Sequence, residues 1–400
     1  MRPSSILRTV TMSLAVCAAS AGSLSFAQTT VEVDGLVDVV GRGQDADMYL
    51  NRTFVQTTNF DALRARIFVQ GGTERTRAFV QILFSDVGYS AVNFHGGYLQ
   101  HRVFENRELY LEAGKIPVHI GTWAPRTYSN RNPLIGIPFA YYYKSTLSSS
   151  MMPRDLDDLL SKRGQGQVGV VYTEPDGTVR GSPMSTLPMM YDNCWDYGAF
   201  VLGANHRFDY AFGVTLGAPG APVNGPDSNG SVTGIAKIGM APIPGLAFHL
   251  SFAYGPYLGS DVTPYIPAGS NLEDYAQALL AGSAEWGWRK LSLNSEVFLN
   301  RFETPIVDHG LGSLSYYLEG VYRFLPGWYA AARYDLVRFE EVASASGPVT
   351  WDENIDRVEA GVGYHVTREL LVKAVAQCNA LDDGWDADRI LPAMQISFAF

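Results

Sequence analysis

The chain of 400 residues has few charges, and only six of its 30 basic residues are lysines. Charged residues make up 18% and hydrophobic residues 46%, Gly, Tyr and Phe are abundant, and the mean hydropathy is close to zero, which excludes a disordered chain or a coiled coil. The net charge is -10 without any Lys/Arg-rich run, which excludes nucleic acid as a partner, because phosphate neutralisation needs clustered cations. Composition barely shifts along the chain, which favours one large fold.

Long apolar runs are also missing. No segment after residue 27 approaches the ~18 consecutive apolar residues of a membrane-spanning helix. Residues 1–27 have the pattern of a secretory signal peptide, in which Arg2 and Arg8 precede a short apolar stretch and small residues precede Gln28. Removal of two Arg and no acid would change the net charge from -10 to -12. We therefore expect residues 28–400 to be exported without a helical anchor.

Cysteine and histidine give little support for metal or redox chemistry. Beyond the leader only Cys194 and Cys378 remain, and the sequence leaves open whether they pair. The seven His show no metal-ligand spacing, and no nucleophile elbow or phosphate-binding glycine motif occurs. We expect no metal, cofactor or catalytic residue. Lipidation of Cys17 is an alternative that the bulky Val16 before it disfavours.

What the sequence does contain is alternation of period two in segments of about ten residues. In the segment 313–324, Leu314, Tyr316, Leu318 and Tyr322 share one face, while Ser313, Ser315, Glu319 and Arg323 share the other. Aromatic residues recur at segment ends, as in girdles at the two membrane interfaces: Trp286, Trp288, Phe324, Trp328, Tyr364, Phe398 and Phe400. A soluble sandwich also alternates, but does not require such girdles. The pattern predicts an all-β, transmembrane antiparallel β-barrel.

The connections alternate between short and long, as they do in outer-membrane barrels. The expected strands lie near 30–42, 59–71, 76–87, 92–103, 107–117, 197–206, 208–217, 231–241, 245–256, 274–287, 290–303, 313–324, 327–339, 353–365, 368–379 and 390–400. This makes sixteen strands. A hairpin within 166–181 would raise the number to eighteen, and parity excludes seventeen.

The last segment alternates up to the terminal Phe400. Such a strand resembles the signal that the outer-membrane barrel assembly machinery recognises. Together with the leader, it predicts a protein of the Gram-negative outer membrane, in contact with membrane lipid and lipopolysaccharide. A buried final strand of a soluble sheet is the alternative.

Several segments resemble the phosphate-selective porin family. The resemblance rests on Asn59–Gly71, Ala78–Gln81, Leu109–Pro117, Gly198–Gly203 and Tyr210–Val214, and covers about the first half of the chain. It implies a sixteen-stranded, usually trimeric porin with a long loop folded into the lumen. Anion-specific members have clustered lysines and an arginine ladder, whereas the six lysines here are dispersed, so phosphate selectivity is not implied.

The longest connection, 118–196, is too apolar for a plain linker. We expect it to fold into the lumen and constrict the pore, where its charged residues would set a transverse field. The candidates are Arg126, Arg131, Lys144 and Arg154 facing Asp155, Asp157 and Asp158. A loop packed on the rim as a trimer contact is the alternative.

Alternation also predicts which strand charges face the lumen. These are Arg64, Arg66, Glu108, Glu112, Glu285, Glu296, Glu319, Arg333, Asp335, Arg357, Glu359 and Lys373. Equally, such charges could be paired across neighbouring strands only to satisfy the interior. The negative total favours a weakly cation-selective or unselective pore.

The function expected from the sequence is that of a porin, a water-filled channel for passive diffusion of small hydrophilic solutes or ions. It is not expected to be an enzyme. The alternatives are an outer-membrane barrel enzyme or a structural barrel without an open pore. A soluble binding module would need polar outward faces, which the rows of Leu, Tyr and Phe contradict.

Overall fold

The computed structural model describes residues 30–43, 60–85, 92–167, 169–173, 177, 179–181, 186–191, 195–223, 231–345, 347–381 and 384–400. The predicted signal peptide and Cys194 lie outside these residues, so the leader and the pairing of Cys194 with Cys378 stay predictions. In this part of the chain, every helix is too short or too polar to cross a membrane.

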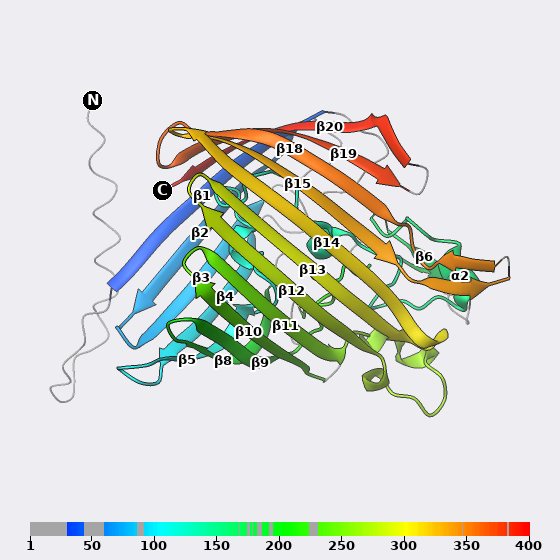
Figure 1. The fold of residues 1–400 in the computed structure, drawn as a ribbon. Helices are drawn as coiled ribbons and strands as arrows, with labels where there is room; N and C mark the ends of the chain where they lie inside the picture. The colour runs from blue at the N-terminus through cyan, green and yellow to red at the C-terminus, as the bar shows by residue number, and fades with distance from the viewer. Residues whose placement is uncertain are drawn as a thin grey trace.

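Sixteen antiparallel strands of the described residues close into a barrel (Figure 1). In order around the barrel they are β1 (Thr30–Arg42), β2 (Phe60–Gly72), β3 (Thr76–Ser85), β4 (Val92–Arg102), β5 (Glu108–Pro117), β8 (Trp195–Ala204), β9 (Phe208–Thr215), β10 (Thr233–Ile243), β11 (Leu246–Pro256), β12 (Ala276–Trp288), β13 (Leu291–Thr304), β14 (Val307–Leu325), β15 (Trp328–Phe339), β18 (Ile355–His365), β19 (Leu370–Leu381) and β20 (Gly384–Ala399). Pairing of β1 with β20, from Leu36↔Ala399 to Arg42↔Ala393, closes the ring.

The predicted all-β barrel with sixteen strands is confirmed. Most strand ends lie within three residues of the prediction, but β14 and β20 begin six residues earlier than expected. The hairpin expected within 166–181 forms as β6 (Val171–Thr173) and β7 (Val179–Gly181). It is a separate two-stranded sheet, so the barrel has sixteen strands and not eighteen. A second such sheet, β16 (Glu341–Ser344) with β17 (Gly347–Thr350), was not predicted.

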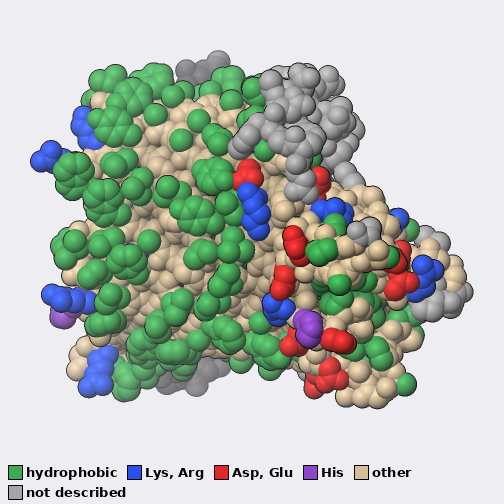
Figure 2. Space-filling model, turned by 45° about the vertical axis from the view of Figure 1, so that its right-hand side comes forward, with side chains coloured by type: hydrophobic (Ala, Val, Ile, Leu, Met, Phe, Trp, Pro, Cys, Tyr) green, Lys and Arg blue, Asp and Glu red, His purple; other side chains and the backbone are tan. Residues whose placement is uncertain are grey.

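The strands form because each has one apolar and one polar or small face, and the barrel sorts these faces outward and inward. On β11, Phe248, Leu250 and Phe252 are exposed on the outer surface, whereas Ser251 and Ala253 are buried inside. Figure 2 shows the resulting apolar belt. Apolar side chains outnumber every other kind on this surface, which water would disfavour and lipid accommodates.

Short turns gather at one end of the barrel, on the left in Figure 1, and long connections at the other. Gly245 and Gly327 have φ values of 83° and 78° in two of the short turns, a conformation that favours glycine. Ring pairs stand near this end, with Trp328 stacked on Tyr364 at 4.4 Å. We call the two ends the turn end and the loop end.

The connections contain short helices. Between β5 and β8 lie η3 (Ala124–Arg126), α1 (Phe139–Tyr142) and α2 (Leu156–Leu160). Between β11 and β12 lie η4 (Ser260–Tyr265) and η5 (Leu272–Asp274). In Figure 1, α2 and β6 stand beyond the loop end of the barrel.

Candidate functional site

The first part of the long connection, residues 118–143, contacts inward-facing residues on many strands of the barrel. Trp123, Phe139 and Tyr141 are fully buried. The Trp123 ring lies 6.0 Å from that of Tyr141 and 6.4 Å from that of Tyr317 on β14. The apolar residues of this segment are therefore buried against the barrel wall from inside.

The segment is first held by β10, β11 and β13. The Thr122 amide donates to Glu296 Oε1 at 2.5 Å, and Lys237 Nζ donates to the Gly121 carbonyl at 2.7 Å. The Gly121 amide donates to Ser251 Oγ at 3.2 Å. Gly121 has a φ of 62°, and a Cβ there would lie 2.5 Å from Glu296 Oε1. Only glycine fits this close approach.

The segment then crosses the lumen. Arg126 donates to Glu319 Oε1 on β14 at 3.1 Å and to Tyr317 Oη at 2.7 Å. Two residues later, Tyr128 Oη donates to Gln81 Oε1 on β3 at 2.9 Å. From β14 to β3 the shorter way around the ring passes β15, β18, β19, β20, β1 and β2, which is nearly half of the barrel. We call residues 126–128 the septum, because they connect opposite walls.

Beyond the septum, a buried lysine holds the backbone. Lys373 Nζ on β19 donates to the carbonyls of Ser129, Asn132 and Leu134 at 2.8, 3.0 and 2.8 Å. Ser129 Oγ donates to Asp38 Oδ2 on β1 at 3.3 Å. Three carbonyls satisfy the three N–H donors of the ammonium group.

Two wall carboxylates accept from the next stretch of backbone. The amides of Ile135 and Gly136 donate to Glu359 Oε1 at 3.1 and 2.8 Å, and the Phe139 amide donates to Asp335 Oδ2 at 2.8 Å. These carboxylates replace the water that the backbone amides of a loop normally bind.

An ion network connects these anchors. Arg333 on β15 lies 3.2 Å from Glu319 and 2.6 Å from Glu359, and Arg357 stands over the Phe139 ring at 4.0 Å. All four charged side chains are at most 1% exposed. Buried charges are tolerated only when they are paired and hydrogen-bonded, as they are here.

Every predicted wall residue faces inward by the strand register, but most do not contact an aqueous pore. Arg64 pairs with Asp38 at 2.6 Å, Arg66 stands over the Tyr128 ring at 5.7 Å, and Glu112 accepts from His119 at 3.2 Å. Seven other predicted wall residues are buried, namely Glu296, Glu319, Arg333, Asp335, Arg357, Glu359 and Lys373. Glu108 is exposed and Glu285 is half-buried. The pairing alternative describes these positions better than an open charged wall.

The structure separates the constriction candidates into two groups. Arg126 lies in the septum, Arg131 follows it as an exposed side chain, and Lys144 is buried. The other four, Arg154, Asp155, Asp157 and Asp158, lie on or beside α2 beyond the loop end.

The three carboxylates at α2 do not face Arg126 and Arg131 across the lumen, in contrast to the expectation. Asp155 caps the helix by accepting from the Asp158 amide at 2.9 Å, and its side chain pairs with exposed Arg154 at 3.1 Å. The acidic run therefore starts a helix, since Asp is a preferred N-cap residue.

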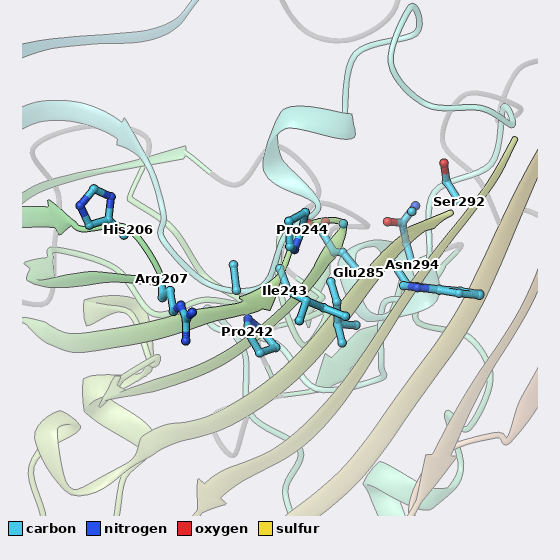
Figure 3. Close-up of a pocket in the computed structure, with 14 residues that line it drawn as sticks. His206, Arg207, Pro242, Ile243, Pro244, Glu285, Ser292 and Asn294 are labelled. Atoms are coloured by element: carbon cyan, nitrogen blue, oxygen red, sulfur yellow. The ribbon is translucent and has the colours of Figure 1, made fainter. Parts of the chain in front are cut away.

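Two cavities open at the turn end. The first, of about 640 Å³, is lined among others by His206, Arg207 and Glu285 and is drawn in Figure 3. The second, of about 400 Å³, lies beneath the septum and includes Arg126. Ser292 and Asn294 line both, so the two cavities adjoin. We call them the β10–β13 cavity and the β13–β19 cavity.

The alternation of β11 places His249 inward, but sequence reasoning missed Asp209 and Ser283, which lie beside it on β9 and β12. His249 Nε2 lies 3.6 Å from Asp209 Oδ2, and Ser283 Oγ lies 3.4 Å from His249 Nδ1. These separations are longer than those of an activated nucleophile, and Ser283 is buried. Asp209 alternates with the outward Phe208 and Tyr210, which is the signal that could have placed it on the lumen side.

These observations define a closed antiparallel barrel with an apolar outer belt and an infolded loop. No description of a known protein family matches the chain, and no curated protein matches its sequence. Solved outer-membrane barrels do match in structure. They include the outer membrane channel DcaP of Acinetobacter baumannii, with 9% identity over 95% of this chain and 100% of that chain and a TM-score of 0.56.

Two further structures have the same fold. OmpF of Salmonella typhi, in complex with daunomycin, is 11% identical over 92% of this chain and 97% of that one, with a TM-score of 0.55. The outer membrane protein OmpT of Vibrio cholerae, in a trimer form, is 11% identical over 93% and 99%, with a TM-score of 0.54. The chain thus has the fold of the Gram-negative outer-membrane barrels, and the resemblance to phosphate-selective porins stays a prediction.

Proposed function

We propose that the chain is an outer-membrane channel for passive diffusion of small hydrophilic solutes, without enzymatic activity. The observation that carries this proposal is the septum, which crosses the lumen between β14 and β3. A chain crossing at residues 126–128 would narrow a barrel of this size. Channel-type structural neighbours support the same reading.

Accessible polar side chains lie near the turn end and not among the buried anchors of the septum. On the β15–β19 wall, the anchors Asp335, Glu359 and Lys373 are at most 1% exposed. On the β9–β11 wall, the Asp209 side chain is 47% exposed and that of His249 13%. Because water and ions need polar, accessible walls, we infer that solutes pass along the β9–β11 wall near Asp209 and His249.

A barrel without an open pore is the second candidate. It is favoured by a buried cluster at the loop end, where Leu147, Met151 and Met190 pack with Phe339 and Trp351. Packing of this kind excludes water from the part of the cross-section that it fills.

Current across a planar bilayer under a salt gradient tests the proposal. We expect stepwise conductance, and we expect Asp209→Asn to shift the reversal potential toward anion preference because it removes an accessible lumen carboxylate. Asp261→Asn, on exposed η4 at the loop end, is the matched control and should leave the reversal potential unchanged. A folded, heat-modifiable barrel that passes no current would instead support the closed barrel.

We also propose that the signal peptide directs export, that the barrel assembly machinery inserts the chain into the outer membrane, and that the chain forms a homotrimer there. Phe400 closes the barrel by pairing with Gly35, whose amide donates to the Phe400 carbonyl at 2.7 Å. The exposed apolar belt supports contact with lipid and lipopolysaccharide. Light scattering of the detergent-purified protein, corrected for bound detergent, would distinguish a trimer from a monomer.

A further inference from the structure

The β13–β19 cavity is basic although the chain as a whole is acidic. Its ionisable lining consists of Arg126, Arg131, Arg323, His365 and Glu319. The only carboxylate among these lining residues is therefore that of Glu319. Charges of one sign in a cavity with low-dielectric walls raise the local concentration of the opposite ion.

Glu319 does not neutralise the cavity, because its two oxygens are already occupied. Arg126 lies 3.1 Å from Oε1 and Arg333 lies 3.2 Å from Oε2, and the Glu319 side chain is fully buried. A carboxylate that is paired on both oxygens and shielded from the cavity attracts little further positive charge.

Two guanidinium groups keep donors for a ligand. Arg131 is exposed, and its side chain makes no ion pair or hydrogen bond with the described residues. Arg323 is also exposed and donates from one nitrogen to Ser292 Oγ at 3.1 Å. Since a guanidinium carries five N–H donors, most of those on Arg131 and Arg323 stay available.

Apolar side chains form part of the remaining cavity wall, beside the polar Asn130, Asn132, Ser292 and Asn294. Pro133, Val321, Tyr329 and Leu371 line it together with the arginines. Tyr329 Oη donates to the Pro133 carbonyl at 3.0 Å, so this hydroxyl is already engaged. A small hydrated ion would gain nothing from such a wall, whereas an apolar group would gain from its burial.

We propose that the β13–β19 cavity binds small organic anions, in which a carboxylate is attached to an apolar or aromatic body. The carboxylate contacts Arg131 and Arg323, and the body contacts the apolar wall. This inference rests on the proposed channel function, because it names the class of solute that collects at the turn-end mouth. The basic character continues around that mouth, where Arg207, Arg289 and Lys290 are exposed in the short turns. Figure 2 shows Lys and Arg side chains along its left edge.

Calorimetry on the detergent-folded protein tests the site with benzoate, and with benzamide as a neutral ligand of the same shape. We expect the unchanged protein to bind benzoate saturably and to bind benzamide about tenfold more weakly. The Arg131→Gln/Arg323→Gln variant should bind benzoate about tenfold more weakly, and Arg131→Lys/Arg323→Lys should recover benzoate binding. Arg107→Gln, an exposed arginine in the turn between β4 and β5, is the matched control and should bind benzoate normally.

The outcomes separate this inference from the channel function, which is measured as bilayer current on the same preparations. Current without benzoate binding, equal binding of benzamide, or benzoate binding that is unaffected by the double glutamine variant would each overturn the anion site and leave the channel standing. Benzoate binding without current would support the site and overturn passive diffusion. Heat-modifiable migration of each variant confirms that the barrel is folded.

Discussion

Arg126 and Tyr128 are two residues apart in the chain, yet their side chains bond to opposite walls of the barrel. Arg126 reaches Glu319 on β14, and Tyr128 reaches Gln81 on β3. The two long side chains and the short backbone between them span the lumen with few atoms. Their bonds to both walls fix the position of the crossing, which would narrow a passage through the barrel.

Truncation of the septum should widen the channel. Tyr128→Ala removes the bond to Gln81 and the ring under Arg66, so we expect larger single-channel conductance with more current noise. The wall bond itself contributes about 1 kcal/mol, too little to unfold the barrel when it is lost. Tyr322→Ala, on the outer surface, should leave the conductance unchanged. An unchanged conductance in Tyr128→Ala would show that solutes do not pass the septum.

Removal of the Lys373 ammonium should lower the free energy of unfolding by more than loss of the Tyr128 bond does. Lys373→Met leaves three buried carbonyls without their donor and Asp38 with one cation fewer nearby. We expect the free energy of unfolding, measured by urea titration in lipid vesicles, to fall by about 3 kcal/mol. Lys290→Met, an exposed lysine in a short turn, is the control and should change it by less than about 0.5 kcal/mol. Equal losses in both variants would contradict the anchoring role.

The barrel itself could be predicted from the sequence because strand alternation is local. Each segment of period two reports its own two faces, and Glu319 and Arg333 were assigned inward for this reason. The early start of β14 at Val307 was missed because Gly310 and Gly312 interrupt the apolar row there. Glycines at these positions look like a turn in the sequence.

The candidate site could be predicted only in part. Glu359 and Lys373 are shielded from water by a segment more than 200 residues away in the sequence. No local sequence pattern reveals such contacts. Asp38 shares the inward face of β1 with the apolar Leu36 and Val40, so the alternation of this strand did not indicate a polar, lumen-facing side. By contrast, the helix cap at Asp155 has a local signature that could have been recognised.

Glycine at position 121 should be irreplaceable. Gly121→Ala places a methyl group against Glu296 and Tyr141 at a φ of 62°, so we expect a loss of about 3 kcal/mol from backbone strain and displacement of the anchor. Gly269→Ala has a similarly positive φ of 92° but open space around the Cβ. Its loss should be about 1 kcal/mol, and the difference in urea midpoint between the two variants measures the contact itself.

The stability of the loop end should depend on pH through Asp352. Asp352, between β17 and β18, is fully buried and accepts from the amides of Thr146, Gly164 and Glu353 at 2.8, 2.7 and 2.8 Å. Burial raises the pKa of Asp352 from 3.8 to about 6, despite these three donors. Because the folded-state pKa is the higher one, protonation favours the folded loop.

The stabilising contribution of this group is therefore greatest at low pH and is lost as the pH rises through about 6. Hydrogen exchange of residues 144–166, corrected for its intrinsic pH dependence, should be about tenfold slower at about pH 5 than at about pH 7.5, or ~1.4 kcal/mol. Asp352→Asn cannot ionise and should remove the difference, whereas Asp261→Asn at exposed η4 should keep it. A difference that persists in Asp352→Asn would assign the pH response to another group.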